Sequence, residues 1–285
     1  MVLPLFYIDD VIKTALREDI NYLDTTTDLM IAEDARSTAR FLAKAEGTLC
    51  GMDIALRVFA LLDDTFTAEV YAKDGDRVKP GDVLAEVAGK TRALLKGERT
   101  ALNLLQHLSG VATATARAVA LTAGTNASIA DTRKTLPGLR AMQKYAVVTG
   151  GGRNHRYNLS DGAMLKDNHI DAAGGIPQAV ALIRQKLGHM VKLEVETRNL
   201  DEVGQALEAG ADVIMLDNMD CAAMTAAVEL CAKKRPGAGR PLLEASGGIT
   251  AETLRAVAET GVDIVSIGAL THSVTALDIS MKIAK

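Results

Sequence analysis

The sequence predicts an α/β protein in which a parallel sheet closes into a barrel, preceded by a smaller unit of mixed helices and strands. From Ala127 onward, six short apolar runs each end in polar residues or glycine, and segments with helical spacing separate them. Alternating strands and helices imply a parallel sheet, and six or more such units favour a barrel over an open sheet. Apolar residues make up 48% of the chain and aromatic residues only 3%, which suits parallel strands buried under helices.

Length and charge exclude several classes of protein. A chain of 285 residues is long enough for one large or two modest domains with a real core. Its formal net charge of -4 argues against a nucleic-acid-binding protein, which normally presents a basic face to phosphates. No apolar stretch reaches the length that crosses a bilayer, and the segment MVLPLFYIDD has an acidic pair where a signal peptide needs an apolar run. We therefore expect neither a nucleic acid nor a membrane as a partner.

The cysteines predict a compartment. Three are present, none of them in a CxxC pair, so neither a disulfide framework nor a thiolate zinc site is indicated. A reducing cytoplasm fits this pattern best.

The N-terminal part of the chain has the pattern of a small α+β unit. Apolar residues recur at helical spacing over 8–16, alternate as in a strand over 37–43, and return to helical spacing over 54–62. Residues 68–90 then form short strands between turn signals, and they look like half of a lipoyl- or biotinyl-carrier module. A carrier needs a lysine at the hairpin tip, whereas this turn offers Asp74-Gly75-Asp76, so we expect a structural sheet.

The middle of the chain is strongly helix-forming. Residues 91–121 predict two consecutive helices interrupted at Ser109-Gly110, because glycine inside a helix costs about 1 kcal/mol relative to alanine. Among the later helices, Asn199 with Glu202 predicts a capping box and Thr250 a second N-cap. Helix ends are predicted at two glycines, Gly210 and Gly261.

Chemistry in a barrel of this kind lies at the carboxyl ends of the strands. The residues at those ends are Asp131, Lys166, Glu196, Asp217, Ser246-Gly247-Gly248 and Gly268. Glycines after the last two strands let backbone N–H groups approach a phosphate, so we expect a phosphate-binding site there. The alternative is that these glycines only permit tight turns.

Two acids end successive strands. Glu196 and Asp217 could share a ligand, either as hard oxygen ligands of Mg²⁺ or as acceptors for ribose hydroxyl groups. Neither has a histidine at metal-motif spacing, so a Mg²⁺ ion bridged by substrate is expected rather than a transition-metal site. Two solvated strand-end acids are the alternative.

Positive charge is concentrated between Asp131 and Ile170, against the acidic balance of the whole chain. The residues concerned are Arg133, Lys134, His155, Arg156 and Lys166. Gathered in a pocket without an anion they would repel one another, and a ligand with carboxylate and phosphate groups would remove that repulsion. Arginine binds both groups in bidentate fashion, and lysine adds a mobile charge. The alternative is a solvated basic loop, and a lone histidine such as His155 is more often structural than catalytic.

Several long motifs in order resemble the quinolinate phosphoribosyltransferase family of NAD synthesis. The similar runs are residues 97–113, 131–140, 144–161, 164–170, 194–196, 215–218, 244–249 and 266–273. The resemblance covers nearly the whole chain, and it implies an N-terminal α/β sandwich and an incomplete, TIM-like α/β barrel. With it we place the first domain at 1–112, joined by the tail 272–285, and the barrel at 113–271.

The resemblance also implies a reaction and its residues. Quinolinate and phosphoribosyl pyrophosphate would give nicotinate mononucleotide, pyrophosphate and carbon dioxide, with Mg²⁺ but without an organic cofactor. The quinolinate site would comprise Arg99 from the second subunit of a homodimer, Arg133, Lys134, His155, Arg156 and Lys166. The site for the phosphorylated substrate would comprise Glu196, Asp217, Ser246, Gly247, Gly248 and Gly268, the two acids also binding Mg²⁺. The catalytic residues would be Lys134, Lys166, Glu196 and Asp217, and an assembly larger than the dimer is compatible with the resemblance.

Other functions remain open from the sequence. Related chains of this fold use nicotinate or accompany molybdenum transport, and would keep the phosphate site while altering the cation cluster. A Schiff-base aldolase would use Lys166 as its nucleophile. A non-catalytic phosphate-binding protein would bind ligand without turnover.

Overall fold

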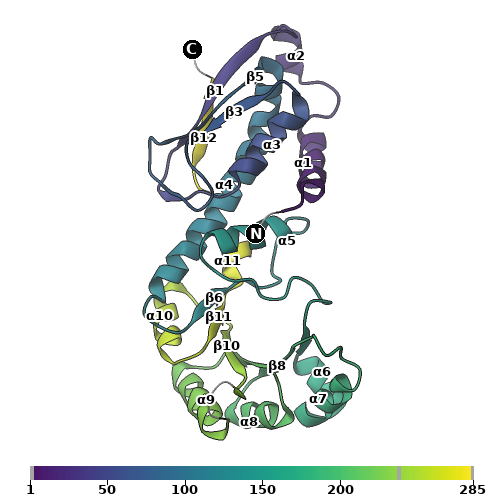
Figure 1. Cartoon of the computed structure of the whole chain (residues 1–285), viewed down its shortest axis with the longest axis vertical. Helices are drawn as coiled ribbons and strands as arrows, with labels where there is room; N and C mark the ends of the chain where they lie inside the picture. The colour runs from purple at the N-terminus through teal and green to yellow at the C-terminus, as the bar shows by residue number, and fades with distance from the viewer. Residues whose placement is uncertain (1–2, 236–238, 284–285) are drawn as a thin grey trace. The chain divides into compact units, whose positions relative to one another are not determined.

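The computed structural model describes residues 3–235 and 239–283, which form two compact units (Figure 1). Unit 1 consists of Met1–Ala116, Thr135–Gly151 and Ala269–Lys285. Unit 2 consists of Arg117–Lys134 and Gly152–Gly268. The predicted combination of a small sheet domain with a parallel-strand α/β domain is confirmed.

Unit 1 is a layer of helices on an antiparallel sheet. Its helices are α1 (Leu5–Asp19), α2 (Thr25–Met30), α3 (Met52–Leu62), α5 (Arg140–Thr149), α11 (Ala269–His272) and most of α4 (Thr91–Leu121). Its strands are β1 (Arg36–Ala43), β2 (Gly47–Thr48), β3 (Thr67–Val70), β4 (Arg77–Val78), β5 (Val83–Lys90) and β12 (Ile279–Ile283). The main sheet has the order β12-β1-β5-β3, and β2 pairs with β4 separately. Because β12 pairs with β1 over Ala39–Ala43, the end of the chain completes the sheet that its beginning starts.

The turn Asp74-Gly75-Asp76, which lacks a carrier lysine, has a structural role. The carboxylate of Asp74 accepts the N–H groups of Gly51 and Met52, at 2.8 and 3.0 Å, where α3 begins. It also accepts the hydroxyl proton of Tyr145, at 2.7 Å. The strands around this turn therefore hold a helix in place, as expected for a structural sheet.

The prediction of two helices over 91–121 is wrong, because α4 is continuous. Leu105, Leu108 and Val111 are fully buried or nearly so on either side of Gly110, and burial of this kind outweighs the weak helix propensity of one glycine. A Cβ atom at position 110 would overlap the carbonyl oxygen of Thr275. Glycine is present here because another segment of unit 1 passes close to the helix.

Helix α5 belongs to unit 1, although the barrel range predicted from the sequence, 113–271, runs through it. Its side chains Met142, Ala146 and Val147 are fully buried and contribute to the same core as α3 and α4. The segment Thr135–Gly151 thus interrupts the sequence of unit 2 and packs within unit 1.

Unit 2 is an incomplete parallel barrel. Its strands are β6 (Ser128–Ala130), β7 (Ala163–Leu165), β8 (Leu193–Thr197), β9 (Val213–Asp217), β10 (Leu242–Ser246) and β11 (Ile264–Ser266). They are ordered β6-β11-β10-β9-β8-β7, so β6 and β7 stand at the two edges. The helices between them are α6 (Asp167–Ala173), α7 (Ile176–Arg184), α8 (Leu200–Ala209), α9 (Cys221–Lys234) and α10 (Ala251–Glu259). Every predicted strand is present.

The predicted N-caps and helix ends of unit 2 are confirmed, but the capping box at Asn199 is only half formed, because the carboxylate of Glu202 accepts the N–H of Arg198. The side chain of Asn199 accepts the N–H of Glu202 at 2.9 Å, and Gly210 ends α8 with a φ of 84°. Thr250 is the N-cap of α10, and Gly261, with a φ of 93°, follows the end of that helix. In the described part of the chain, no helix has the length and apolarity required to cross a membrane.

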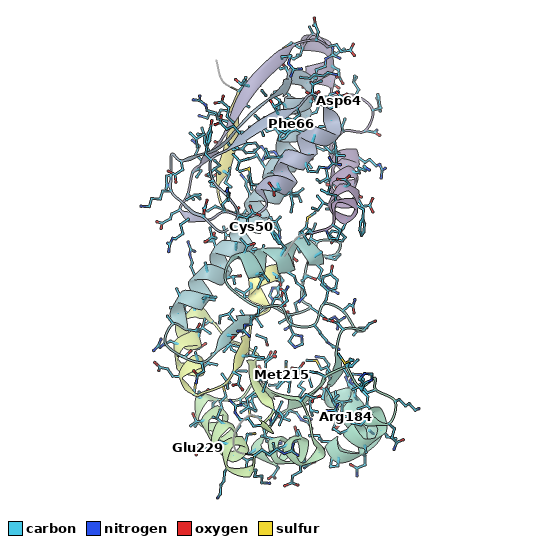
Figure 2. All side chains as sticks on the ribbon, in the orientation of Figure 1. Cys50, Asp64, Phe66, Arg184, Met215 and Glu229 are labelled. Atoms are coloured by element: carbon cyan, nitrogen blue, oxygen red, sulfur yellow. The ribbon has the colours of Figure 1, made fainter. Side chains whose placement is uncertain are left out.

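Removal of Phe59 should destabilise unit 1 strongly. Its ring is fully buried on α3 and packs against Phe41 and Phe66, with ring centroids 6.1 and 5.5 Å away; Phe66 is labelled in Figure 2. We expect Phe59→Ala to lower the free energy of unfolding by about 3–5 kcal/mol, measured by urea denaturation. Tyr22→Ala is the control, because that side chain is 87% exposed and its loss should change stability by less than about 0.5 kcal/mol. Equal losses in both variants would contradict the described core.

Candidate active site

A pocket of about 360 Å³ lies at the carboxyl ends of the strands of unit 2. Strand β8 contributes Glu196, β9 contributes Met215 and Asp217, and β10 contributes Ser246; Met215 is labelled in Figure 2. Its other lining residues are Thr132, Arg133, Lys134, His155, Arg156, Met164, Lys166, Glu244 and Ser266. The position agrees with the rule that barrel active sites lie at this end.

The structure brings most of the predicted site residues together in this pocket. The predicted residues that line it are Arg133, Lys134, His155, Arg156, Lys166, Glu196, Asp217 and Ser246. Three predicted glycines, at positions 247, 248 and 268, follow β10 and β11 without being lining residues. Arg99 lies exposed on α4 in unit 1 and does not line the pocket.

The sequence analysis missed several lining residues. They are Thr132, Met164, Met215, Glu244 and Ser266. Glu244 had a usable signal, because it stands two residues before Ser246 on the same strand and therefore points to the same face.

The cations come from segments that partly buried hydrogen bonds hold in place. Asp131 follows β6 with no exposed surface, and its Oδ1 accepts the N–H of His155 at 2.8 Å. The guanidinium of Arg156 donates to the carbonyl oxygen of Gly162 at 2.8 Å. Burial lowers the pKa of Arg156, and the neighbouring charge of Arg133 lowers it further. The pocket thus holds positive charges that repel one another, and an anionic ligand would relieve that repulsion.

Lys166 is paired with an acid at the pocket edge. Its Nζ lies 3.3 Å from Oε2 of Glu196, and its side chain is 49% exposed. The backbone N–H of Lys166 donates to Nδ1 of His169 at 3.1 Å, where α6 begins. A Schiff-base lysine needs a desolvated amine, whereas this one is hydrated and paired with a carboxylate, so the arrangement does not favour an aldolase.

The two strand-end acids lie on adjacent strands. The parallel register pairs Glu196 with Met215, two residues before Asp217. Oxygen atoms from neighbouring strand ends are suited to Mg²⁺ and to sugar hydroxyl groups. With only two carboxylates, a metal ion there would need further oxygen ligands from a substrate.

Residue Asn218 shapes the glycine turn beside these acids. It has a φ of 53°, the one positive value at a non-glycine residue in the described ranges 3–235 and 239–283. Its N–H donates to the carbonyl oxygen of Ser246 at 2.9 Å, and its Nδ2 donates to Asp217 at 3.0 Å. A Cβ atom on Gly247 would overlap Oδ1 of Asn218. Residue 247 must therefore be glycine for the two turns to approach this closely.

The fold and the pocket together define a class of protein. An α/β barrel whose carboxyl-end pocket combines cations, two acids and a glycine turn is typical of enzymes that act on phosphorylated, anionic small molecules.

Comparison with known proteins identifies the family. Residues 24–109 match the model of the quinolinate phosphoribosyl transferase N-terminal domain, and residues 111–282 match that of its C-terminal domain. The chain belongs to the quinolinate phosphoribosyl transferase family.

Individual relatives are similar to this chain over nearly its full length. A probable nicotinate-nucleotide pyrophosphorylase (carboxylating) of Bacillus subtilis is 48% identical over 266 residues, which is 93% of this chain and 90% of the relative. A mitochondrial quinolinate phosphoribosyltransferase (decarboxylating) of Nicotiana tabacum is 42% identical, over 98% of this chain and 83% of the relative. The crystal structure of NadC from Streptococcus pyogenes superposes with a TM-score of 0.94 at 42% identity and covers 100% of both chains.

Substitution of Gly247 should lower the stability of the protein, because a side chain there would overlap Asn218. We expect Gly247→Ala to lower the free energy of unfolding by about 1–3 kcal/mol, measured by urea denaturation. Gly248→Ala is the matched control, because that residue also has positive φ but a Cβ atom there meets no neighbour within 4 Å. In an Asn218→Gly background the excess loss at position 247 should shrink. An unchanged loss in that background would show that the overlap is not its cause.

Proposed function

We propose that this chain catalyses phosphoribosyl transfer to quinolinate with decarboxylation, which is the activity named for its relative of Nicotiana tabacum. The substrates are quinolinate and phosphoribosyl pyrophosphate, and the products are nicotinate mononucleotide, pyrophosphate and carbon dioxide. The observation that carries the proposal is the pocket itself, where the predicted cations from three segments meet the two strand-end acids. A dicarboxylate and a polyphosphate are the ligands such a pocket suits.

The cations would bind the acid substrate. Guanidinium groups of Arg133 and Arg156 suit bidentate contacts with its carboxylates, and Lys166 adds a third positive charge. The ring of His155 lines the same site, while its two nitrogens face Arg156 and the buried glutamates. Lys134, which is exposed, would lie between the acid and the pyrophosphate.

The acids and glycines would bind the phosphorylated substrate. Glu196 and Asp217 would accept hydrogen bonds from the ribose hydroxyls and hold Mg²⁺ together with substrate oxygens. Mg²⁺, when bound, offsets negative charge on the pyrophosphate. The 5′-phosphate would lie against Ser246, the turn Gly247-Gly248 and Gly268, where backbone N–H groups can approach it.

The reaction needs positioning more than protein nucleophiles. The carbon–oxygen bond to pyrophosphate breaks with its electron pair on the leaving group, and the carboxylates of Glu196 and Asp217 stabilise the positive charge left on the ribose. The pyridine nitrogen of quinolinate then bonds to the anomeric carbon. The resulting pyridinium ring withdraws electrons, so the adjacent carboxylate leaves as carbon dioxide and the ring carbon takes a proton. Lys134 offsets charge on the departing pyrophosphate, and Lys166 contributes to decarboxylation by holding the acid.

The active form would be a homodimer or a larger assembly of such dimers. Arg99 is exposed on α4 in unit 1 and would complete the acid site of a second subunit. The three cysteines are free thiols, which is consistent with action in the cytoplasm.

Turnover with defined substrates tests the function directly. Purified protein mixed with quinolinate, phosphoribosyl pyrophosphate and Mg²⁺ should form nicotinate mononucleotide and carbon dioxide in equal amounts. Product from nicotinate but none from quinolinate would identify a nicotinate-using or otherwise divergent relative. Binding of both substrates without turnover would indicate a non-catalytic phosphate-binding protein.

Removal of single arginines should weaken the acid site. We expect Arg133→Ala and Arg99→Ala each to lose a charge-assisted contact worth about 1.5–3 kcal/mol, seen as a higher KM for quinolinate. Arg184→Ala is the control, since that arginine pairs with Asp212, does not line the pocket, and should leave KM unchanged. An unaltered KM in either test variant would remove that residue from the site.

Mixing two impaired variants, assayed at a quinolinate concentration well below their KM values, tests whether the site is shared. Arg99→Ala carries its defect in unit 1 and Lys134→Ala in unit 2, so a mixed dimer with shared sites has one intact site and one doubly altered site. After exchange of subunits, activity should recover to roughly one quarter of wild type. No recovery, with exchange verified by mass spectrometry, would show that Arg99 does not act across subunits.

A further inference from the structure

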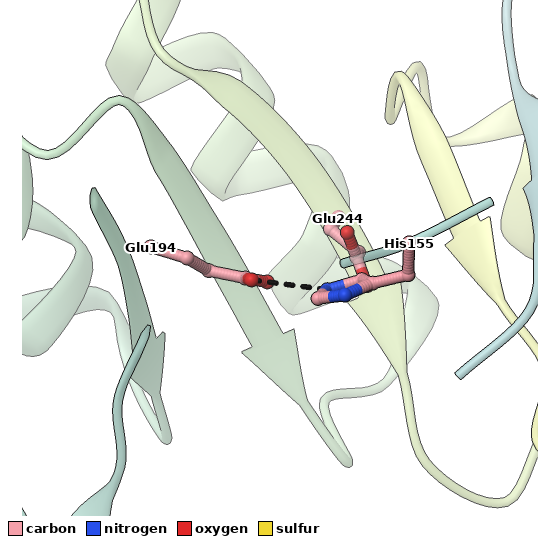
Figure 3. Close-up of side chains that lie close together, drawn as sticks. All are labelled: His155, Glu194 and Glu244. Carbon is pink, nitrogen blue, oxygen red and sulfur yellow. Dashed lines mark ion pairs between the residues drawn. The ribbon is translucent and has the colours of Figure 1, made fainter. Parts of the chain in front are cut away.

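Two buried glutamates and the partly buried His155 form a cluster beside the pocket, which we call the floor cluster: His155, Glu194 on β8 and Glu244 on β10. Figure 3 shows the imidazole of His155 facing the carboxylates of both glutamates. Its Nε2 lies 3.0 Å from Oε2 of Glu194 and 3.5 Å from Oε1 of Glu244. The glutamates are only 6% and 2% exposed.

Hydrogen bonding assigns the proton of the His155 ring. Nδ1 accepts the backbone N–H of Arg156 at 2.7 Å, so this nitrogen carries no proton. The ring proton is therefore on Nε2, which faces the two carboxylates. A metal ion would need the Nε2 lone pair, so the ring as it is held serves as a donor to acids and not as a metal ligand.

The two glutamates have few donors between them. In the described part of the chain, Oε1 of Glu194 and Oε1 of Glu244 are buried without a hydrogen-bond partner. The groups that face Glu244 are Glu194 on β8, His155, Ser266 on β11 and Asp131 after β6. Burial raises the pKa of Glu244 to about 7, and the charge of Glu194 adds to the rise, whereas a positive charge on His155 would oppose it. Around neutral pH, a large fraction of Glu244 is therefore the uncharged acid.

The floor cluster is linked to both cation segments. The N–H of His155 donates to Asp131, two residues before Arg133, and the ring of His155 accepts from the main chain of Arg156. Glu194 holds the ring of His155, and the ring in turn accepts the main-chain N–H of Arg156. The ring therefore fixes the position of the backbone at Arg156. His155 and Glu244 also line a second cavity, of about 710 Å³, together with Ser128, Val213 and other residues at the amino ends of the strands.

We propose that Glu194 and Glu244 are positioning residues for the acid-binding half of the pocket, acting through the ring of His155. This inference rests on the proposed function, because it assigns the acid substrate to the segments that His155 joins. Glu194 accepts the ring proton, and Glu244 fills the opposite side without adding a second negative charge beneath a dianionic substrate. The glutamates act through His155 on the acid and not on the phosphorylated substrate, whose predicted ligands Glu196 and Ser246 lie two residues further along β8 and β10.

A pH dependence follows from Glu244. A carboxyl group with a raised pKa is neutral below that pKa and ionised above it. As pH rises through about 7, Glu244 gains a negative charge that repels a dianion, so the KM for quinolinate should rise. The KM for phosphoribosyl pyrophosphate should change much less over the same interval.

Two isosteric variants separate the roles of the glutamates. Glu194→Gln should raise the KM for quinolinate on the order of tenfold and change that for phosphoribosyl pyrophosphate by less than about twofold. Glu244→Gln copies the neutral acid, so it should keep the low KM for quinolinate and abolish its rise above pH 7. The control is Glu229→Gln, which makes the same change at an exposed residue of α9 and should match wild type. For Glu194→Gln, parallel changes in both KM values or an unchanged KM for quinolinate would overturn the proposal. For Glu244→Gln, a rise in the KM for quinolinate above pH 7 as large as in wild type would overturn it.

A spectroscopic test on the wild-type protein does not depend on how the variants fold. Only five histidines are present, so ¹⁵N labelling of histidine can resolve the ring nitrogens of His155. The signals should be those of a neutral ring protonated at Nε2, and a ring protonated at Nδ1 would overturn the proposal. Absence of turnover by wild type would instead overturn the proposed function, while the ring signals still report on the floor cluster.

Discussion

Repulsion among like charges is the constraint on which the pocket of unit 2 depends. Two cations 4 Å apart repel by about 4 kcal/mol near a protein surface, and the pocket gathers several. The protein offsets part of this itself, for example through Glu196 beside Lys166. An anionic ligand would reduce the repulsion further, so the same charges that repel one another favour binding of an anion.

Local patterns explain why much of the fold could be predicted from the sequence. Each barrel strand is a short apolar run between polar residues, and helix ends such as Asn199 and Gly210 depend on neighbouring atoms only. The continuity of α4 and the place of α5 depend on distant partners. Gly110 is accommodated because Thr275 passes beside it, and α5 packs in the core of unit 1 although it lies between strands of unit 2 in sequence. No local propensity encodes either contact.

The site shows the same division between position and contact. The ends of the predicted strands indicated where Glu196, Asp217 and Ser246 would lie, because residues at the carboxyl edge of a parallel sheet lie close together. What the sequence could not reveal is the function of an individual hydrogen bond. His155 was expected to bind the acid, yet its two ring nitrogens face Arg156 and the buried glutamates, so its orientation is set inside the protein. Asn218 likewise gains its importance only from the three-dimensional approach of Gly247.

The pairing of β12 with β1 has a consequence for the order of synthesis. Strand β1 ends at Ala43, but its neighbour begins at Ile279, and the whole of unit 2 is made in between. While the ribosome is still adding those residues, β1 presents an open edge with unsatisfied N–H and C=O groups, which invites pairing with other chains. The first unit to emerge is thus the last to be finished. A nascent chain would benefit from a chaperone that covers this edge, and a C-terminal truncation would leave it permanently exposed.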